Sequence, residues 1–217
     1  MLHFSFPLLS ALLLITLFFL IKIQIIKYAF EKIGIHHWSL FLLLFFSLLG
    51  SYVNIPIWEI PPSFIYRSPV GSSTFWSWFT PPFFPAGTTV AINLGGAIIP
   101  ILISFKLMTK APSPLKTTLV TFIVSLVVHA FARPVPGAGI TVPSVLPSLC
   151  AALCSLLIEG CATAQTAYIA GSIGTLIGAD LANLPRIAGL GIATVSIGGA
   201  GTFDGIFLSG IVAALLA

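Results

Sequence analysis

The sequence predicts an all-α fold: a polytopic transmembrane helical bundle of six to eight membrane segments, forming a single domain over residues 1–217. Apolar residues make up 58% of the chain and charged residues 6%, and the mean hydropathy is +1.13. Ordinary soluble domains carry about 25% charged residues, so this chain cannot cover a surface that faces water. At about 30 residues for each helix with its loop, the chain holds six or seven helices and no soluble domain.

Long apolar runs, separated by prolines, glycines and charged residues, place the spans in order. The first run, 5–26, has no basic segment before it and no small-residue cleavage site, so we expect a retained helix rather than a signal peptide. Prolines and aromatic residues in "STFWSWFTPPFFP" predict an interfacial loop over residues 58–87, with a lid over a cavity as the functional alternative. Five further spans are expected at 38–57, 88–107, 117–132, 143–161 and 163–182.

The last stretch, residues 187–217, does not fit a single span. As one helix it would be about 46 Å long, whereas the hydrocarbon core is about 30 Å thick. Glycines gather in "SIGGAGTFDG" around residues 198–201. We therefore expect at least one broken or re-entrant helix near 198–201.

The lysines predict the orientation. Lys22, Lys27 and Lys32 follow the first span, and Lys106, Lys110 and Lys116 follow the third. By the positive-inside rule, both loops are expected in the cytoplasm. Arg133 and Arg186 fall on the opposite side in this arrangement.

Helix-breaking residues coincide with polar groups at five places. The polar residues are Asn54, Asn93, Arg133, Asp180 and Asp204. Irregular backbone at membrane depth is tolerated where it is buried in protein or lines a cavity, so the coincidence predicts a polar internal site. The alternative is that the glycines only let helices pack closely.

The two aspartates are the main candidates for chemistry. A charge near the bilayer centre costs about 2.5–3.5 kcal/mol, so each buried carboxylate needs a partner, a proton or water. Glu159 is expected at a cytoplasmic helix end, where snorkelling explains it, whereas Asp204 has no such explanation. Backbone N–H groups freed at Gly199 and Gly201 are expected to serve as its partners. His129 is expected to be buried, either as a packed neutral histidine or as a functional group, because histidine is the side chain type whose ordinary charge change falls near neutral pH.

Four motifs carry a resemblance to a known family. They are "GSYVNIPI", "RPVPGAGITVP", "AYIAGSIGTLIGADL" and "SIGGAGTFDGIFLSGIVAALL". From about Leu49 to the carboxyl end, the chain resembles an archaeal and bacterial family of multi-pass membrane proteins catalogued only as a domain of unknown function. The resemblance implies a prokaryotic integral protein of the plasma membrane and no assigned activity.

A weaker resemblance is to intramembrane aspartyl proteases of the prepilin-peptidase type. Asp180 is followed by "LANLP", and Asp204 follows "GAG" with Thr202 and Phe203 inserted. The resemblance implies a catalytic pair, in which two carboxyls share one proton and act as base and acid. Along one continuous helix the aspartates would lie about 36 Å apart, so they meet only if the chain folds back between Pro185 and Gly201.

Three interpretations of function remain open. The first is an aspartyl-protease-like hydrolase acting on a transmembrane peptide. The second is an ion-coupled transporter or channel for a small solute or cation, with Asn54, Asn93, Arg133 and His129 beside a broken helix. The third is a non-catalytic scaffold or partner subunit. The lipid bilayer is the expected surrounding in each, with no nucleic acid partner, no cofactor and no metal, and the distance between the two carboxyls separates the first two.

Overall fold

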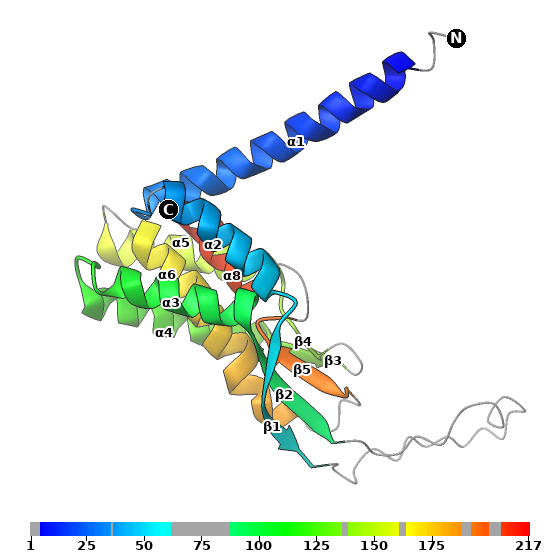
Figure 1. The fold of residues 1–217 in the computed structure, drawn as a ribbon. Helices are drawn as coiled ribbons and strands as arrows, with labels where there is room; N and C mark the ends of the chain where they lie inside the picture. The colour runs from blue at the N-terminus through cyan, green and yellow to red at the C-terminus, as the bar shows by residue number, and fades with distance from the viewer. Residues whose placement is uncertain are drawn as a thin grey trace, which may run out of the picture.

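The computed structural model describes residues 5–35, 37–61, 87–135, 139–160, 164–187, 192–199 and 205–217. This part of the chain is mostly helical and carries two small sheets (Figure 1). The helices are α1 (Ser5–Lys32), α2 (His37–Gly50), α3 (Ile99–Met108), α4 (Pro114–Phe131), α5 (Leu146–Glu159), α6 (Ala164–Thr175), α7 (Leu184–Ile187) and α8 (Gly205–Leu216). Two π-helical segments, η2 (Leu94–Ile98) and η3 (Leu176–Asp180), precede α3 and follow α6, and a 3₁₀ turn, η4 (Leu181–Asn183), follows η3.

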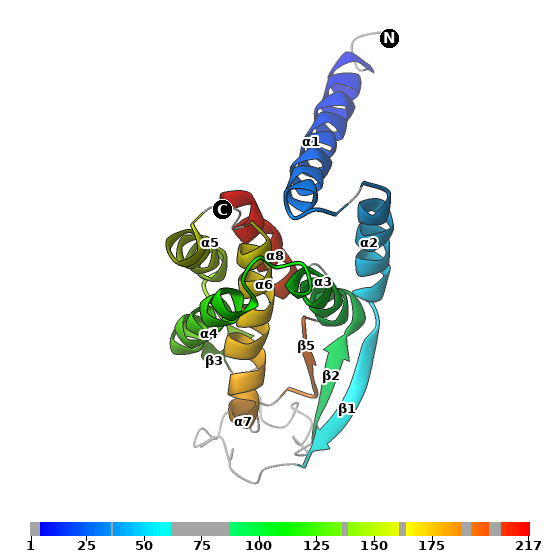
Figure 2. The same ribbon diagram turned by 90° about the vertical axis from the view of Figure 1, so that its left-hand side faces the viewer.

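Helix α6 is the centre of the bundle, with α4, α5 and α8 around it (Figure 2). Small residues allow these close contacts. A Cβ atom at Gly171 would lie 2.7 Å from the Ser209 carbonyl oxygen of α8, and one at Gly174 would lie 2.7 Å from Val124 of α4. The backbones of α6, α4 and α8 therefore touch where glycine leaves room, as in the small-residue packing of membrane helices.

The outer surface of the bundle is more apolar than parts of its interior. On α4, the hydroxyl residues Thr117, Thr121 and Ser125 are buried, whereas large apolar side chains are exposed at Leu115, Leu119, Phe122 and Leu126. An apolar stripe of this kind requires lipid or another apolar partner to cover it. Among the described helices, α4 is long and apolar enough to cross a membrane, and three shorter apolar helical stretches are Leu94–Met108, Leu146–Glu159 and Gly205–Leu216.

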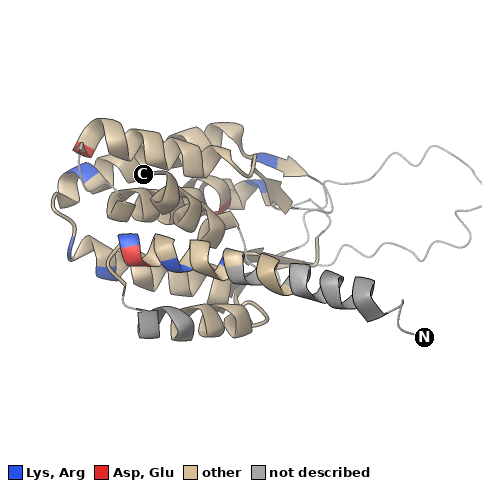
Figure 3. Ribbon diagram, turned by 90° about the horizontal axis from the view of Figure 1, so that it is seen from above, with Lys and Arg blue, Asp and Glu red and all other residues tan. Residues whose placement is uncertain are grey.

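Basic and acidic residues lie at both ends of the bundle (Figure 3), with lysines gathered at one end and Arg133 and Arg186 at the other. We call one the lysine end, defined by Lys32, Lys106, Lys110 and Lys116 at or beside the ends of α1, α3 and α4. The chain ends of several helices meet there, because Lys32 Nζ donates to Leu215 O at 3.4 Å and Gln165 Nε2 donates to Ile33 O at 3.1 Å. We call the other the sheet end, because it carries the strands Asn54–Ile60, Thr88–Asn93, Arg133–Val135, Gly139–Thr141 and Thr194–Ile197.

The main sheet has the strand order β1-β2-β5, with β1 (Asn54–Ile60), β2 (Thr88–Asn93) and β5 (Thr194–Ile197). Strands β1 and β2 are antiparallel, with Asn54 opposite Asn93, and β2 and β5 are parallel, with Thr89 opposite Thr194. A second, two-stranded sheet pairs β3 (Arg133–Val135) with β4 (Gly139–Thr141).

The sheets correct the expectation of an all-α fold. The predicted span 38–57 is a helix only to Gly50, and the predicted span 88–107 begins as strand β2 before it becomes helical. Extended backbone at Asn54–Ile60 and Thr88–Asn93 pairs across a large sequence separation, which apolar content alone does not reveal. The predicted spans 117–132, 143–161 and 163–182 correspond to α4, α5 and α6 with η3 and η4.

The carboxyl-terminal stretch is also different from the prediction. It is not one straight helix, because β5 ends at Ile197 and α8 begins at Gly205. The element before the glycines is a strand, however, so the expectation of a broken helix was wrong in that respect. At the amino-terminal end, α1 continues to Lys32, so Lys22 and Lys27 lie within a helix and not in a loop.

Candidate functional site

Asp180 is half-buried and lies at the sheet end of the central helix, a name we use for α6 together with η3 and η4. It is the last residue of η3, where the helical hydrogen-bond pattern widens. Single π turns of this kind are frequent at functional sites, because they redirect the side chains that follow. Asp180 Oδ2 accepts a hydrogen bond from the Gly198 N–H at 3.2 Å. The backbone after β5 has therefore returned to the end of η3.

Glycine is required at position 198, where the chain after β5 reaches the end of η3. Its φ of 83° lies in the left-handed region, and a Cβ atom would lie 2.6 Å from both the backbone nitrogen and the Cβ atom of Ala97 in η2. Only glycine fits without displacing η2. Gly198 thus brings two π segments, η2 and η3, to the same turn.

A pocket of about 250 Å³ lies between β5 and the end of the central helix. Its lining includes the polar side chains of Asp180, Thr194 and Ser196, together with Gly199. The remaining lining residues are Gly139, Ile140, Leu184, Ile187, Ile192, Val195 and Ile197. A carboxylate beside a mixed polar and apolar pocket fits a site that binds a small or extended ligand.

A network of side-chain hydrogen bonds around Asn183 lies at the end of the central helix. The Asn183 side chain is buried, and its Nδ2 atom donates to Gly178 O at 3.0 Å and Ala179 O at 2.9 Å. The same nitrogen lies 3.3 Å from His129 Nδ1, and Asn183 Oδ1 accepts from Arg186 Nη1 at 3.0 Å. Sequence analysis did not select Asn183, although its position three residues after Asp180 and two residues before Pro185 was a usable signal.

His129 and Arg133 lie at the end of α4, as the sequence placed them. His129 reaches Asn183 and not the pocket, so it supports η3 from the side opposite to β5. Arg133 is exposed, and its carbonyl oxygen accepts from Thr141 Oγ1 at 3.2 Å within the small sheet. Neither side chain is among the residues that line the pocket.

The side chains of Asn54 and Asn93 form hydrogen bonds that join elements of the fold. Asn93 is 1% exposed, and its Nδ2 atom donates to Ser51 O at 2.7 Å and to Asn54 Oδ1 at 3.0 Å. Its Oδ1 atom accepts from Gly96 N at 2.7 Å and caps η2. Asn54 Oδ1 also accepts from Ser196 Oγ at 2.5 Å, which joins β1 to β5. The Asn93 amide is thereby occupied and does not line the pocket.

Glu159 has partners at the lysine end. Its carboxylate accepts from Thr166 Oγ1 at 2.6 Å and from Thr117 Oγ1 at 3.1 Å. Both threonines lie in the first turns of helices, where the positive end of the helix dipole favours a carboxylate. The link ties α5 to α4 and α6, so it replaces the snorkelling that the sequence suggested.

Asp204 and Gly201 lie outside the described residues, and so do the contacts expected for them. The described residues before and after this segment lie near Asp180 and η3. Gly199 lines the pocket with Asp180, and Ile206, the second residue of α8, packs in one cluster with Leu176 of η3 and Ile197 of β5. The fold-back between Pro185 and Gly201, which a meeting of the aspartates requires, is present as far as Gly198.

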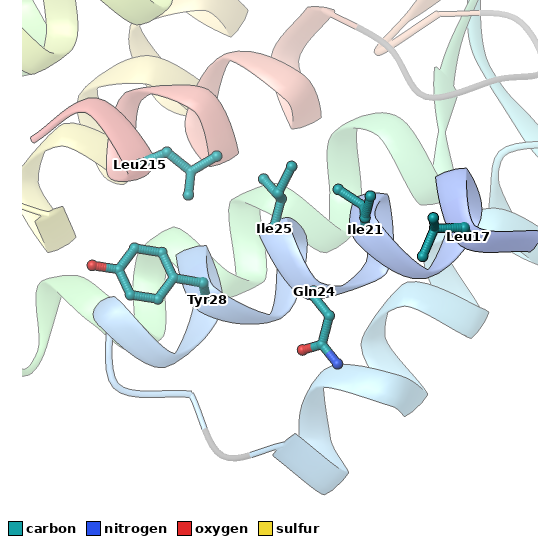
Figure 4. Close-up of a pocket in the computed structure, with 6 residues that line it drawn as sticks. All are labelled: Leu17, Ile21, Gln24, Ile25, Tyr28 and Leu215. Carbon is teal, nitrogen blue, oxygen red and sulfur yellow. The ribbon is translucent and has the colours of Figure 1, made fainter. Parts of the chain in front are cut away.

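A larger hollow elsewhere is apolar. It lies between α1 and α8 and has a volume of about 500 Å³. Its lining residues are Leu17, Ile21, Gln24, Ile25, Tyr28 and Leu215 (Figure 4). It holds no carboxylate and is open on one side, so its chemistry suits a hydrocarbon surface and not a catalytic centre.

Comparison with known proteins places the chain in a family. The family described as "Protein of unknown function (DUF1614)" matches residues 48–216. The chain belongs to the DUF1614 family. The predicted resemblance to a family catalogued only as a domain of unknown function, from about Leu49 to the carboxyl end, is thereby confirmed. The membrane nature of this DUF1614 chain and its resemblance to intramembrane aspartyl proteases stay predictions. No curated protein and no solved structure matches the chain.

Proposed function

We propose that this DUF1614 protein is a multi-pass membrane hydrolase of the aspartyl-protease type, with Asp180 and Asp204 as its catalytic pair. The observation that carries the proposal is the return of Gly198 to the Asp180 carboxylate at 3.2 Å. It removes the separation of about 36 Å that a continuous helix would impose. Six residues after Gly198, the chain reaches Asp204.

The exposed faces of the helices support the membrane part of the proposal. Exposed leucines lie on α5 at Leu149, Leu153 and Leu157, and on α8 at Leu208 and Leu216, in addition to the stripe on α4. The opposite faces carry small residues such as Ser148 and Ala151. Lipid on the outside and small residues between helices are the arrangement of a membrane bundle.

The chemistry requires the two carboxyls to share one proton. The ionised carboxylate removes a proton from a water molecule, and the resulting hydroxide bonds to the carbonyl carbon of the substrate peptide bond. The protonated carboxyl donates its proton to the carbonyl oxygen. When the tetrahedral intermediate collapses, the C–N bond breaks and the amine leaves with a proton, so one water is consumed for each peptide bond.

Ion-coupled transport is the second candidate. One observation favours it: a half-buried carboxylate ends an irregular helix inside a polar pocket, as in carriers that hold a cation at a helix break. The occupied amide of Asn93 weakens this candidate, because it removes one of the expected ligands. Under this interpretation, Asp180 binds the coupling cation and does not need Asp204 beside it.

The test compares Asp180→Asn, Asp204→Asn and the control Glu31→Gln, which neutralises an exposed carboxylate paired with Lys27 on α1. Asn retains the shape and an oxygen acceptor, so all three proteins should fold. Purified protein is assayed for cleavage of a transmembrane peptide and, in proteoliposomes, for cation or solute uptake. The hydrolase proposal expects both aspartate variants to lose cleavage by about 10³-fold or more, and Glu31→Gln to retain it.

Other outcomes assign the function differently. If no cleavage occurs and an aspartate variant silences uptake, the protein is a transporter and the protease proposal is wrong. If neither activity is found and both variants match Glu31→Gln in every assay, the scaffold interpretation stands.

A further inference from the structure

We propose that the free edge of β5 is the docking site for the substrate, which binds as an extended peptide added to the sheet beside Asp180. This inference rests on the proposed hydrolase function and specifies the conformation that its substrate adopts. It follows from the strand order, the direction of the backbone groups and the position of the pocket beside β5.

Strand β5 is an edge strand in the described part of the chain. The order β1-β2-β5 leaves one side of β5 without a strand partner, and that side faces the end of the central helix (Figure 2). Thr89 N donates to Ala193 O at 2.9 Å, with Thr89 opposite Thr194. In a strand, successive residues direct their backbone groups to opposite sides, so those of Thr194 and Ser196 point away from β2.

Within the described ranges of the chain, three of these outward groups have no hydrogen-bond partner. No described residue bonds the Thr194 N–H, the Thr194 carbonyl or the Ser196 N–H, whereas the Ser196 carbonyl accepts from Gly199 N at 3.2 Å. Away from water, unpaired backbone groups of this kind are costly and favour the addition of another strand. Main-chain pairing of this type gives affinity, and side-chain pockets give selectivity.

The position of the pocket beside β5 indicates where the peptide would lie. The outward backbone groups of Thr194 and Ser196 can pair with an extended chain, whereas the backbone groups of a helix already bond to one another. The pocket of about 250 Å³ is lined by Thr194, Ser196 and Asp180, so a chain paired with this edge lies in it. A strand beside Thr194–Ile197 would run past Asp180, because Gly198, the residue after β5, already contacts that carboxylate.

Cross-linking tests the docking site independently of cleavage. The protein is made without its three native cysteines, with Asp180→Asn to prevent turnover and with Leu184→Cys, a residue that lines the pocket. The probe is a leucine-alanine transmembrane peptide of about 25 residues, with a Gly-Val-Ser-Val-Gly segment near one end and a single cysteine moved along it. Disulfide yield should alternate with a period of two residues. A period of 3.6 residues, or no preferred position, would overturn the proposal.

A proline variant then tests the backbone groups. Thr194→Pro removes the outward N–H and keeps the ladder to β2, because proline is tolerated at a free edge. Thr194→Ala removes the same hydroxyl and keeps the N–H. The proline variant should cross-link about tenfold less than the alanine variant at matched thermal stability, and equal yields would contradict docking at this edge.

The two proposals fail in different ways. If cross-links alternate and the protein with Asp180 intact never cleaves the peptide, β5 binds peptides and the hydrolase proposal is wrong. If cleavage occurs and Thr194→Pro cleaves as well as Thr194→Ala, the hydrolase stands and the substrate binds elsewhere.

Discussion

The amide of Asn183 joins three parts of the candidate site at the scale of single residues. It occupies the carbonyl oxygens of Gly178 and Ala179 that the π turn releases, and it contacts both His129 and Arg186. Because Arg186 donates to Oδ1, the Asn183 nitrogen must face His129. The two N–H groups of Nδ2 already donate to Gly178 O and Ala179 O, so His129 Nδ1, at 3.3 Å, lies beside an occupied donor.

We expect Asn183→Leu to destabilise the protein by about 3 kcal/mol, because two buried carbonyl oxygens lose their donor. Thermal unfolding in detergent measures the change. The control is Thr109→Ala, which removes a hydrogen bond to Lys106 O at an exposed site and should cost less than about 0.5 kcal/mol. Equal effects of the two substitutions would show that the Asn183 network contributes little.

At the scale of elements, the contact between α4 and the end of the central helix depends on glycine. A Cβ atom at Gly178 would overlap Ser125 O and lie 2.9 Å from Val128 Cβ. Gly205, by contrast, begins α8 with nothing described within 4 Å of such an atom. The two glycines therefore form a matched pair for testing close helix packing.

Gly178→Ala should cost about 1–3 kcal/mol, since α4 and η3 must separate to admit the methyl group. Gly205→Ala should leave stability within about 0.5 kcal/mol of the unsubstituted protein. Midpoints of thermal unfolding in detergent, compared at equal protein-to-detergent ratio, measure both. An unchanged midpoint for Gly178→Ala would mean that the helices are not held in contact here.

Hydropathy predicted α4, α5 and α6 well because each is an apolar run that stays helical over its length. It failed at Asn54–Ile60 and Thr88–Asn93, where the apolar runs form strands. The partner of each strand lies far away in sequence, as Asn54 opposite Asn93 shows, and no local pattern encodes that pairing. For the same reason, sequence analysis predicted a ligand role for Asn93, whereas its amide caps η2.

The candidate site was predicted in part. Asp180 was selected because a carboxylate in an apolar run needs a partner, and its partner proves to be the Gly198 backbone. The glycines of the tail indicated where the chain turns. Asn183 was missed because an amide on a helix is common, and only the widened turn of η3 makes it necessary.

At the scale of the whole molecule, the lysines distinguish the two ends of the bundle. The lysine end should face the cytoplasm by the positive-inside rule, and the sheet end, with Asp180 and its pocket, should face outward. In protein without native cysteines, a cysteine replacing exposed Lys110 should react with a membrane-impermeant maleimide only in inverted vesicles. A cysteine at Val145, 64% exposed at the sheet end, should react only from outside, and the reverse pattern would invert the topology.

The central claim is that the carboxyl groups of Asp180 and Asp204 lie close together. Formation of a disulfide between cysteines at positions 180 and 204 tests this claim most directly. A disulfide requires Cα atoms about 4.4–6.8 Å apart. In cysteine-free protein, Asp180→Cys with Asp204→Cys should oxidise as completely as the control pair Thr117→Cys with Thr166→Cys, whose hydroxyl oxygens lie 3.0 Å apart. Full oxidation of the control with a reduced 180–204 pair would contradict the catalytic pair and the hydrolase with it.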